Sequence, residues 1–320
     1  MTIIYASRHV TTYDYALPVT ASHHAAHLMP RARVTQTVHE SGVRVRPEPS
    51  HRSARTDCFG NPVLFFTLEE RHRSLEVESV SLVTVRAPVL PYAETTSPWD
   101  QVREWLASDL SPDTLEACRY VFDSPFIATL PAVEDYARSS FPPGRPILAA
   151  AIDLMHRIHR DFTYDSAATT LATPLAEVLR QRRGVCQDFA HLQIACCRAM
   201  GLAARYVSGY LHTCRVAPST SEGAPAPMIG ADASHAWVAV HVPAVGWVDL
   251  DPTNDVLPTL EHITLAWGRD YDDVSPLKGV MMGGGAHALH VAVRVTPCAP
   301  PAAPEPPADP DDHHTAPGRK

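Results

Sequence analysis

Three side chains that stand far apart in the sequence have the types that acyl transfer by a thiol requires. They are Cys186, His235 and Asp251. In that chemistry a cysteine attacks a carbonyl carbon, a histidine acts as the base, and a carboxylate orients the histidine. The segments around these residues therefore decide whether the three can form one site.

Cys186 is predicted to stand in the first turn of a helix. Gly184 interrupts the preceding segment, a helical run follows from Cys186 to Met200, and Gly201 occupies the C-cap position. A thiol there lies near unpaired backbone N–H groups and the positive end of the helix dipole, which favour the reactive thiolate. The position also fits a small apolar residue packed beneath a helix, since buried structural cysteines are common.

His235 and Asp251 are predicted on two neighbouring strands, residues 234–242 and 246–251. Strand alternation places the valines of both segments on the face opposite to His235 and Asp251, and that valine face fits burial against a helix layer. Asp249 shares a face with Asp251. Periodicity therefore leaves either carboxylate as the partner of His235.

The connection between the two strands decides their register. A connection centred on Pro243 would set His235 opposite Asp251. A connection centred between Ala244 and Val245 would set His235 opposite Asn254 instead, and a β-bulge could reconcile the two arrangements.

Several segments, taken in order, resemble the transglutaminase-like core, a branch of the papain-like cysteine enzymes. The closest resemblance is to the bacterial subgroup with an additional N-terminal β domain, and it extends from Met1 to about Thr296. The matching segments are YDY, LMPR and DCFGN near the start, then GVCQDFAHL, ARYVSGYL, SHAWVAVHVPAVGWVDLDPTN and GRDYDDVSPLKGV. Asp251 opens the DPTN segment, so the resemblance implies Cys186 as nucleophile, His235 as base and Asp251 as its partner.

The resemblance implies attack of Cys186 on an amide carbonyl of a peptide or protein, through a thioester intermediate. The oxyanion would be held by the backbone N–H of Cys186 and by a second donor, for which Gln181, Gln187 and Tyr164 are candidates. Water would release the product of a peptidase or amidase, and an amine would release that of a transglutaminase. The bacterial relatives favour hydrolysis, and no metal or organic cofactor is expected.

Two hypotheses about a different kind of function compete with the enzymatic one. The first is a binding module that has kept the fold without catalysis, which the presence of all three residue types disfavours. The second is a redox-sensing thiol, but the helix places Cys197 about 16 Å from Cys186, too far for a disulfide. Cys196 and Cys197 fit inert core thiols, and Asp188 fits a carboxylate that complements the helix N-terminus.

Composition excludes several partners and favours the cytoplasm. The net charge of −8 gives no basic surface for nucleic acid and no polybasic patch for a membrane. No apolar run approaches the ~20 residues of a membrane span. Met1–Tyr5 opens directly into a strand pattern without a signal sequence, and seven scattered cysteines without a Cys-x-x-Cys pair suit reduced thiols.

The predicted fold class is α+β. Residues 1–95 alternate as strands and form an antiparallel β-sandwich-like domain. Residues 96–146 form a helical bridge, residues 147–296 a papain/transglutaminase-like core with a central helix against an antiparallel sheet, and residues 297–320 a disordered tail.

Two further segments carry separate predictions. His23, His24 and His27 lie close together, but no spaced motif supplies the remaining ligands of a zinc site. We expect them in a polar loop or on an exposed helix face. Residues 218–231 are rich in Pro, Ser, Gly and Ala, and this loop either borders the cleft and selects substrates or has no role.

Overall fold

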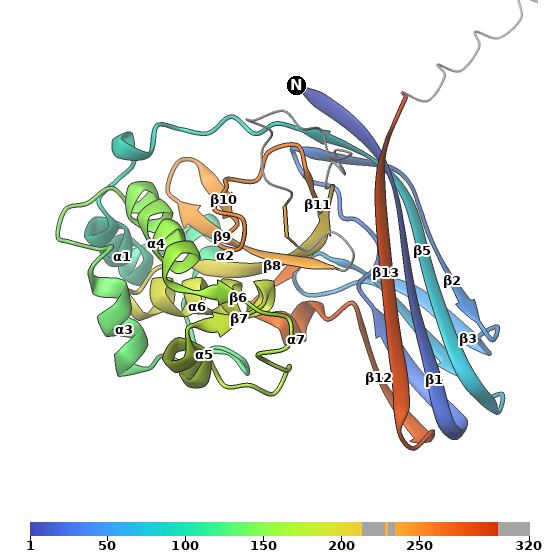
Figure 1. The fold of residues 1–320 in the computed structure, drawn as a ribbon. Coiled ribbons are helices and arrows are strands. Elements are labelled where there is room, and N and C mark those ends of the chain that lie inside the picture. The colour runs from blue at the N-terminus through green and yellow to red at the C-terminus, as the bar shows by residue number, and fades with distance from the viewer. Residues whose placement is uncertain (213–227, 230–233, 300–320) are drawn as a thin grey trace, which may run out of the picture.

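A computed structural model of the protein describes residues 1–212, 228–229 and 234–299. Figure 1 shows a long curled β-sheet beside a mixed core of helices and strands. The predicted α+β class is confirmed. The loop predicted at 218–231 lies outside the described residues except for 228 and 229, as do Cys214 and the tail from residue 300.

The curled sheet has seven strands, and its order is β2-β5-β1-β4-β3 with β12 and β13 also paired to β1. The strands are β1 Thr2–Ala26, β2 Gln36–Arg46, β3 His51–Thr56, β4 Pro62–Leu68, β5 His72–Arg86, β12 Leu277–Gly283 and β13 His287–Cys298. The partners of β1 change between Asp14 and Val19. The first part pairs with β5 and β13, and the second part pairs with β4 and β12.

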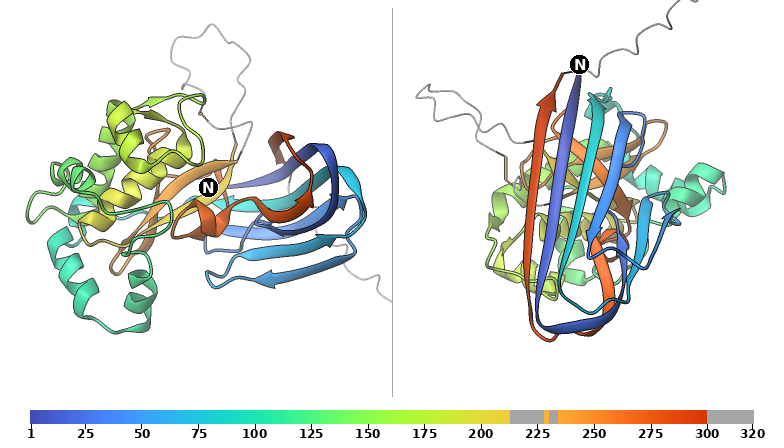
Figure 2. Two further views of the ribbon diagram at one scale, coloured as in Figure 1. Left: turned by 90° about the horizontal axis from the view of Figure 1, so that it is seen from below. Right: turned by 90° about the vertical axis from the view of Figure 1, so that its right-hand side faces the viewer.

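The two parts of this sheet fold over a common apolar core. Val45 of β2 and Val77 of β5 are buried in one cluster with Phe66 and Leu68 of β4. Figure 2 shows the sheet curling at the end where β1 changes partners. The sandwich-like domain predicted from alternation is thus made by one continuous sheet folded on itself.

The last two strands, β12 and β13, join the N-terminal sheet, although the predicted domain boundaries placed their residues in the catalytic core. Residues 277–296 were assigned to the catalytic core, but β12 and β13 pair with β1 along its whole length, for example Ser7 with Val295. In Figure 1 the red strands at the end of the chain lie beside blue β1. β13 also continues to Cys298, two residues into the segment predicted as tail. Alternation predicts a strand but not the sheet that it joins, because any edge with free N–H and C=O groups can accept it.

The core consists of helices packed on a four-stranded antiparallel sheet with the order β10-β9-β8-β11. Its strands are β8 Ala204–Leu211, β9 His235–Val242, β10 Gly246–Leu250 and β11 His262–Gly268, and a short parallel pair joins β6 Thr163–Tyr164 to β7 Arg183–Gly184. The helices are η1 Ala93–Thr95, α1 Trp99–Ser108, α2 Pro112–Cys118, α3 Pro131–Arg138, α4 Ile147–Asp161, α5 Leu175–Gln181, α6 Cys186–Ala199 and α7 Tyr271–Val274. The described helices of the predicted bridge share one hydrophobic core with α4 and α6.

Helix α6 is central and lies against β8 and β9. Ala190 and Ile194 on the helix are buried in the same cluster as Val238 and Val240 of β9, so the valine face meets the helix layer as predicted. Cys196 and Cys197 are fully buried, and burial raises the pKa of the Cys197 thiol to about 12. Both cysteines are therefore inert core residues.

Two N-terminal motifs attach the curled sheet to the core. Asn61, from the DCFGN segment, is fully buried. Its amide nitrogen donates to the Trp267 carbonyl at 2.8 Å, and its amide oxygen accepts the Trp267 N–H at 3.0 Å. Arg31, from the LMPR segment, donates to the same amide oxygen and stacks over the Trp267 ring. These motifs therefore hold β11 of the core against the N-terminal domain.

Replacing Asn61 by alanine should lower the free energy of unfolding by about 2–4 kcal/mol, because it leaves buried polar groups of Trp267 and Arg31 without partners. Urea denaturation followed by tryptophan fluorescence measures the change. Glu69→Ala, at an exposed position in the turn between β4 and β5, is the control. Equal stabilities of the two variants would show that this contact does not hold the two parts together.

Candidate active site

Cys186 is the first residue of α6, as predicted. The parallel pairing of β6 with β7 fixes the segment that leads into the helix. Gly184 is required there, because a Cβ at this position would lie 2.6 Å from Asp188 Oδ2. That carboxylate accepts the Val185 N–H at 2.8 Å and the Thr169 hydroxyl at 2.6 Å, and burial raises its pKa. Asp188 thus caps the helix, in agreement with the role expected for it.

The β9–β10 register differs from both predicted alternatives. Val242 pairs with Gly246 and Val238 with Leu250, so the connection is centred on Ala244, which adopts a φ of 63°. Continuation of this ladder would not place Asp251 opposite His235. β10 ends at Leu250 instead, and the chain turns at Asp251.

This turn brings Asp251 to His235. His235 Nε2 lies 2.8 Å from Asp251 Oδ2, and both side chains are fully buried. Asp249, the alternative left open by periodicity, accepts a hydrogen bond from Arg33 Nη1 at 2.7 Å instead. The structure therefore pairs His235 with Asp251.

Four further groups donate to Asp251. Its Oδ1 accepts the backbone N–H groups of Thr253 and Asn254 at 3.0 and 3.2 Å. Its Oδ2 accepts the Asn254 side-chain amide at 2.8 Å and lies 3.1 Å from His262 Nε2. Burial alone would raise the pKa of this carboxyl, but the charge and hydrogen bond of His235, followed by those of His262, hold the pKa far below its usual range. Asp251 is therefore a buried anion at neutral pH.

His235 is held in its charged form. Burial alone would lower its pKa, but the charge and hydrogen bond of Asp251, followed by interaction with Cys186, raise the pKa above its ordinary value. Because Nε2 faces Asp251, Nδ1 is the ring nitrogen left for the thiol. Nδ1 has no hydrogen-bond partner among the described residues. His235 thus contacts Asp251 through Nε2, and Cys186 is the next group that acts on the charge of its ring.

Two tyrosines flank the sulfur. Tyr164 of β6 pairs with Gly184 of β7, two residues before Cys186. The pKa of Tyr164 is raised by burial and then by the charge of Cys186. Tyr206 of β8 is buried, and burial followed by the charge of Cys186 raises its pKa as well. Of the candidate oxyanion donors, Tyr164 therefore lies near the thiol, whereas the exposed Gln181 donates its amide to Glu177 on α5. Gln187 follows Cys186 and is half-buried.

The histidines singled out near the N-terminus do not converge on one point. His23 and His24 lie on strand β1, so the expectation of a loop or a helix was wrong for them, and His27 follows directly after the strand. His23 contacts Thr67 Oγ1, His24 stacks on Phe66, and His27 contacts the Ser275 carbonyl. Alternation along the strand separates their side chains, which explains the absence of a joint site.

The described residues contain another group with the types of metal ligands, formed by His235, Asp251 and His262, whose ligand atoms lie within 4.8 Å of one another. The Asn254 amide donates to the same Asp251 oxygen that both imidazoles face. Hydrogen bonds thus account for the convergence of these side chains, and we assign no metal to it.

Sequence reasoning missed His262 and Asn254. Asn254 could have been found, because it belongs to the DPTN segment and an Asp followed by such residues commonly forms an Asx turn. His262 carries no such signal. It starts β11, and only the tertiary fold brings its ring to the carboxylate and edge-on to Trp237.

Replacing His262 by leucine should lower kcat/KM by about 10–100-fold, because Asp251 loses a donor that fixes its orientation. The loss should appear in kcat and not in KM, and His262→Gln, which retains an N–H near the position of Nε2, should recover most of it. His241→Leu is the matched control, since His241 is also a buried imidazole of this sheet but has no contact with Asp251. Indistinguishable kinetics of His262→Leu and His241→Leu would assign His262 a packing role only.

Comparison with known proteins identifies the family to which this fold belongs. Models of the bacterial transglutaminase-like N-terminal region and of the transglutaminase-like superfamily match residues 5–84 and 135–252. An uncharacterized protein of Mycobacterium tuberculosis is 40% identical over 298 residues, which is 92% of each chain. An uncharacterized protein of Mycobacterium leprae is 36% identical over 291 residues, covering 90% of this chain and 96% of the relative.

A solved structure supports the fold. The crystal structure of a "putative cysteine protease" from Cytophaga hutchinsonii matches with a TM-score of 0.69 at 17% identity, covering 95% of this chain and 93% of that one. The fold is therefore transglutaminase-like. The chain belongs to the transglutaminase-like superfamily and carries the N-terminal region of its bacterial members.

Within the described ranges, every helix is too short or too polar to cross a membrane.

Proposed function

We propose that the protein is a cysteine peptidase or amidase that cleaves amide bonds of a peptide or protein through a thioester on Cys186. The observation that carries the proposal is the buried His235–Asp251 pair, 2.8 Å apart, together with a cysteine at a helix N-terminus whose interaction contributes to the raised pKa of the imidazole. A charged imidazole and a helix N-terminus both stabilise a thiolate.

The reaction starts with His235 protonated and Cys186 as thiolate. The sulfur attacks the amide carbonyl carbon, and the carbonyl oxygen takes the negative charge beside the backbone N–H of Cys186. The intermediate collapses, the C–N bond breaks, and the proton on His235 Nδ1 moves to the leaving amine. A thioester and neutral imidazole remain.

Hydrolysis closes the cycle. Water gives a proton to His235 and attacks the thioester carbon, and the C–S bond breaks to release a carboxylic acid and the thiolate. Asp251 keeps Nε2–H directed to itself throughout, so Nδ1 is the nitrogen that loses and regains the proton. The ionised Asp251 stabilises the imidazolium in both halves of the cycle.

Product analysis tests this proposal. Purified protein is incubated with a glutamine-containing peptide, with and without a primary amine, and the products are weighed by mass spectrometry. A peptidase or amidase gives the same cleaved or deamidated products in both reactions, whereas a transglutaminase gives an amine adduct. Cys186→Ala is the control, and unchanged peptide in all reactions over a broad peptide set would overturn the proposal.

A further inference from the structure

A small apolar groove lies where the two ends of the chain meet. It has a volume of about 230 Å³. It is lined by Tyr13, Tyr15, His24, Leu277, Gly279, Met281 and His287, which come from β1, β12 and the start of β13. Since β12 and β13 were expected in the core, the sequence did not predict this groove.

Aromatic rings form one side of the groove. The rings of Tyr13 and Tyr15 are stacked with centroids 6.0 Å apart. The His287 ring lies 5.5 Å from the first and 6.0 Å from the second, at steep angles to both. Rigid aromatic walls of this kind bind apolar groups with little loss of conformational entropy.

The other side is shaped by glycine and methionine. A Cβ on Gly279 would lie 2.4 Å from His24 Nδ1, so the His24 ring packs directly against the Gly279 backbone. Met281 is 40% exposed, and its flexible thioether can adapt to apolar groups of different shape. Leu289 on β13 is 51% exposed and extends the apolar surface.

No lining residue of the groove is an acid, a lysine or an arginine. The groove contains two histidines, His24 and His287. Burial lowers the pKa of His24 to about 4, which keeps that ring neutral at pH 7. The groove therefore suits an uncharged group. Its volume is below the ~300 Å³ at which sites for whole small molecules begin, so it fits a single side chain.

The groove is connected to the thiol by a row of tyrosines. Ser275 Oγ lies 3.4 Å from the Tyr271 hydroxyl and 3.4 Å from the carbonyl of Leu277, which lines the groove, so Tyr271 of α7 lies close to the groove. The rings of Tyr271 and Tyr206 are 6.3 Å apart, and Tyr206 belongs to the core cluster against which Cys186 packs. In Figure 1, α7 leads from the core towards β12. An extended peptide with its reacting amide at Cys186 can run over the half-buried Tyr271 towards the groove.

We propose that this groove is a substrate subsite, which binds one apolar or aromatic side chain of the polypeptide several residues from the amide that Cys186 attacks. The proposal rests on the proposed function and adds the substrate class: polypeptides with an uncharged apolar residue at a fixed distance from the reacting bond. The curled N-terminal domain, together with the last two strands, then selects substrates.

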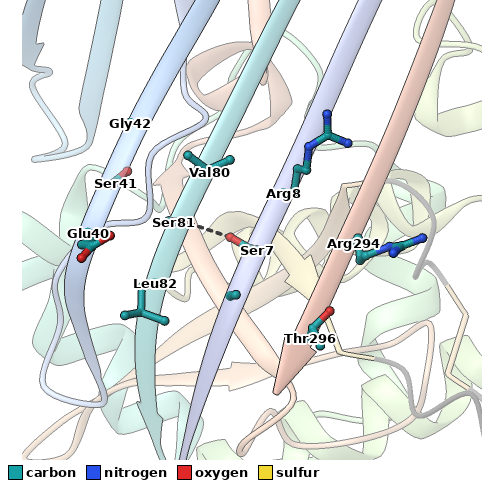
Figure 3. A pocket seen from close by; sticks show the side chains of 11 residues that line it. Ser7, Arg8, Glu40, Ser41, Gly42, Val80, Ser81, Leu82, Arg294 and Thr296 are labelled. Atoms are coloured by element: carbon teal, nitrogen blue, oxygen red, sulfur yellow. Dashed lines mark hydrogen bonds between the residues drawn. The ribbon is translucent and has the colours of Figure 1, made fainter. Parts of the chain in front are cut away.

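A larger groove does not carry the same argument. Figure 3 shows it crossing β2, β5, β1 and β13, with Arg8, Val80, Leu82 and Arg294 on the face of the sheet that points away from the core. Its volume is about 640 Å³, but Arg8 is paired with Glu78, and none of the contacts described links the groove to Cys186. This larger groove therefore supports no substrate subsite.

Met281→Glu tests the proposal, with Met282→Glu as matched control. The two methionines are neighbours on β12, both are exposed, and strand alternation directs them to opposite faces. Met281→Glu places a charge in the groove, and Met282→Glu places the same charge outside it. Thermal denaturation of both variants shows whether the fold is retained.

The readout is kcat/KM for two peptides that differ only in carrying phenylalanine or alanine at the position that the wild-type protein selects most strongly. We expect a preference of about 10-fold or more for phenylalanine in the wild type, and its loss in Met281→Glu but not in Met282→Glu. A short substrate that does not reach the groove should be cleaved equally by all three proteins. Equal behaviour of the two methionine variants, or wild-type indifference to the side chain, would overturn the subsite.

A binding assay separates this proposal from the proposed function. Fluorescent peptides are titrated into Cys186→Ala and into Cys186→Ala carrying Met281→Glu. Selective binding of the phenylalanine peptide that Met281→Glu weakens supports the subsite even if the wild type cleaves no peptide. Cleavage without any such selectivity retains the proposed function and rejects the subsite.

Discussion

Cys186→Ala should eliminate turnover, with kcat/KM at least about 10³-fold below the wild type for every peptide that the wild type cleaves. The sulfur is the atom that forms the thioester, and no other described cysteine stands at a helix N-terminus beside an imidazole. Rates measured with a fluorogenic peptide, at enzyme concentrations high enough to detect residual activity, test this expectation.

The matched control is Cys118→Ala. Cys118 is half-buried like Cys186, but it lies at the end of α2, where burial and then the charge of Asp109 raise its pKa. This variant should retain wild-type rates and a similar melting temperature. If Cys186→Ala keeps more than about a tenth of the wild-type rate, which is only about 1.4 kcal/mol of barrier, the thioester mechanism is wrong.

Asp251→Asn should lower kcat by about 10²–10⁴-fold, because an amide neither stabilises the imidazolium nor fixes its tautomer. The expected sign of the pH effect follows from the charge. Asp251 raises the pKa of His235, so its neutralisation moves deprotonation of His235 to lower pH. The alkaline limb of the kcat/KM profile should therefore shift towards neutral pH.

Asp249→Asn is the control for this shift. Asp249 shares the strand face of Asp251 but is paired with Arg33, so its neutralisation should leave the pH profile unchanged. An unchanged alkaline limb in Asp251→Asn would contradict the pairing with His235. A shift in both variants would indicate a general effect of charge on the sheet.

Acid stability provides an independent check of the same pair. The pKa of Asp251 is held below its unfolded value, so the carboxylate contributes stability above about pH 4 and loses it as pH falls further. The pKa of His235 is raised, so its contribution is present below about pH 6.5 and is lost as pH rises through the raised value. The two contributions overlap between these limits, and the pair stabilises the fold most there.

The helices that hold the site were predictable because their periodicity is strong. The predicted first residue of α6 is correct, since apolar spacing and the flanking glycines act within a few residues. The C-cap of α6 was expected at Gly201, but the helix ends at Ala199 and Met200 is the C-cap. Helix ends depend on single hydrogen bonds and are accordingly less predictable.

The remaining features depend on tertiary contacts. The register of β9 and β10 is set by a connection centred on Ala244, whose positive φ is unusual for alanine and is not signalled by its residue type. His262 reaches Asp251 only after β11 joins β8 at the edge of the sheet. Similarly, β13 pairs with β1, although the two strands lie near opposite ends of the sequence. Local patterns cannot encode such pairings.

The rate of alkylation of Cys186 by iodoacetamide, measured from about pH 5 to about pH 9 in the wild type and in His235→Ala, tests the central claim most directly. A thiolate held beside the charged imidazole predicts fast labelling of the wild type well below pH 8, and labelling of His235→Ala that becomes fast only near the ordinary thiol value of about 8.5. Labelling that follows an ordinary thiol in both proteins would contradict the claim that Cys186 and His235 act as one catalytic pair.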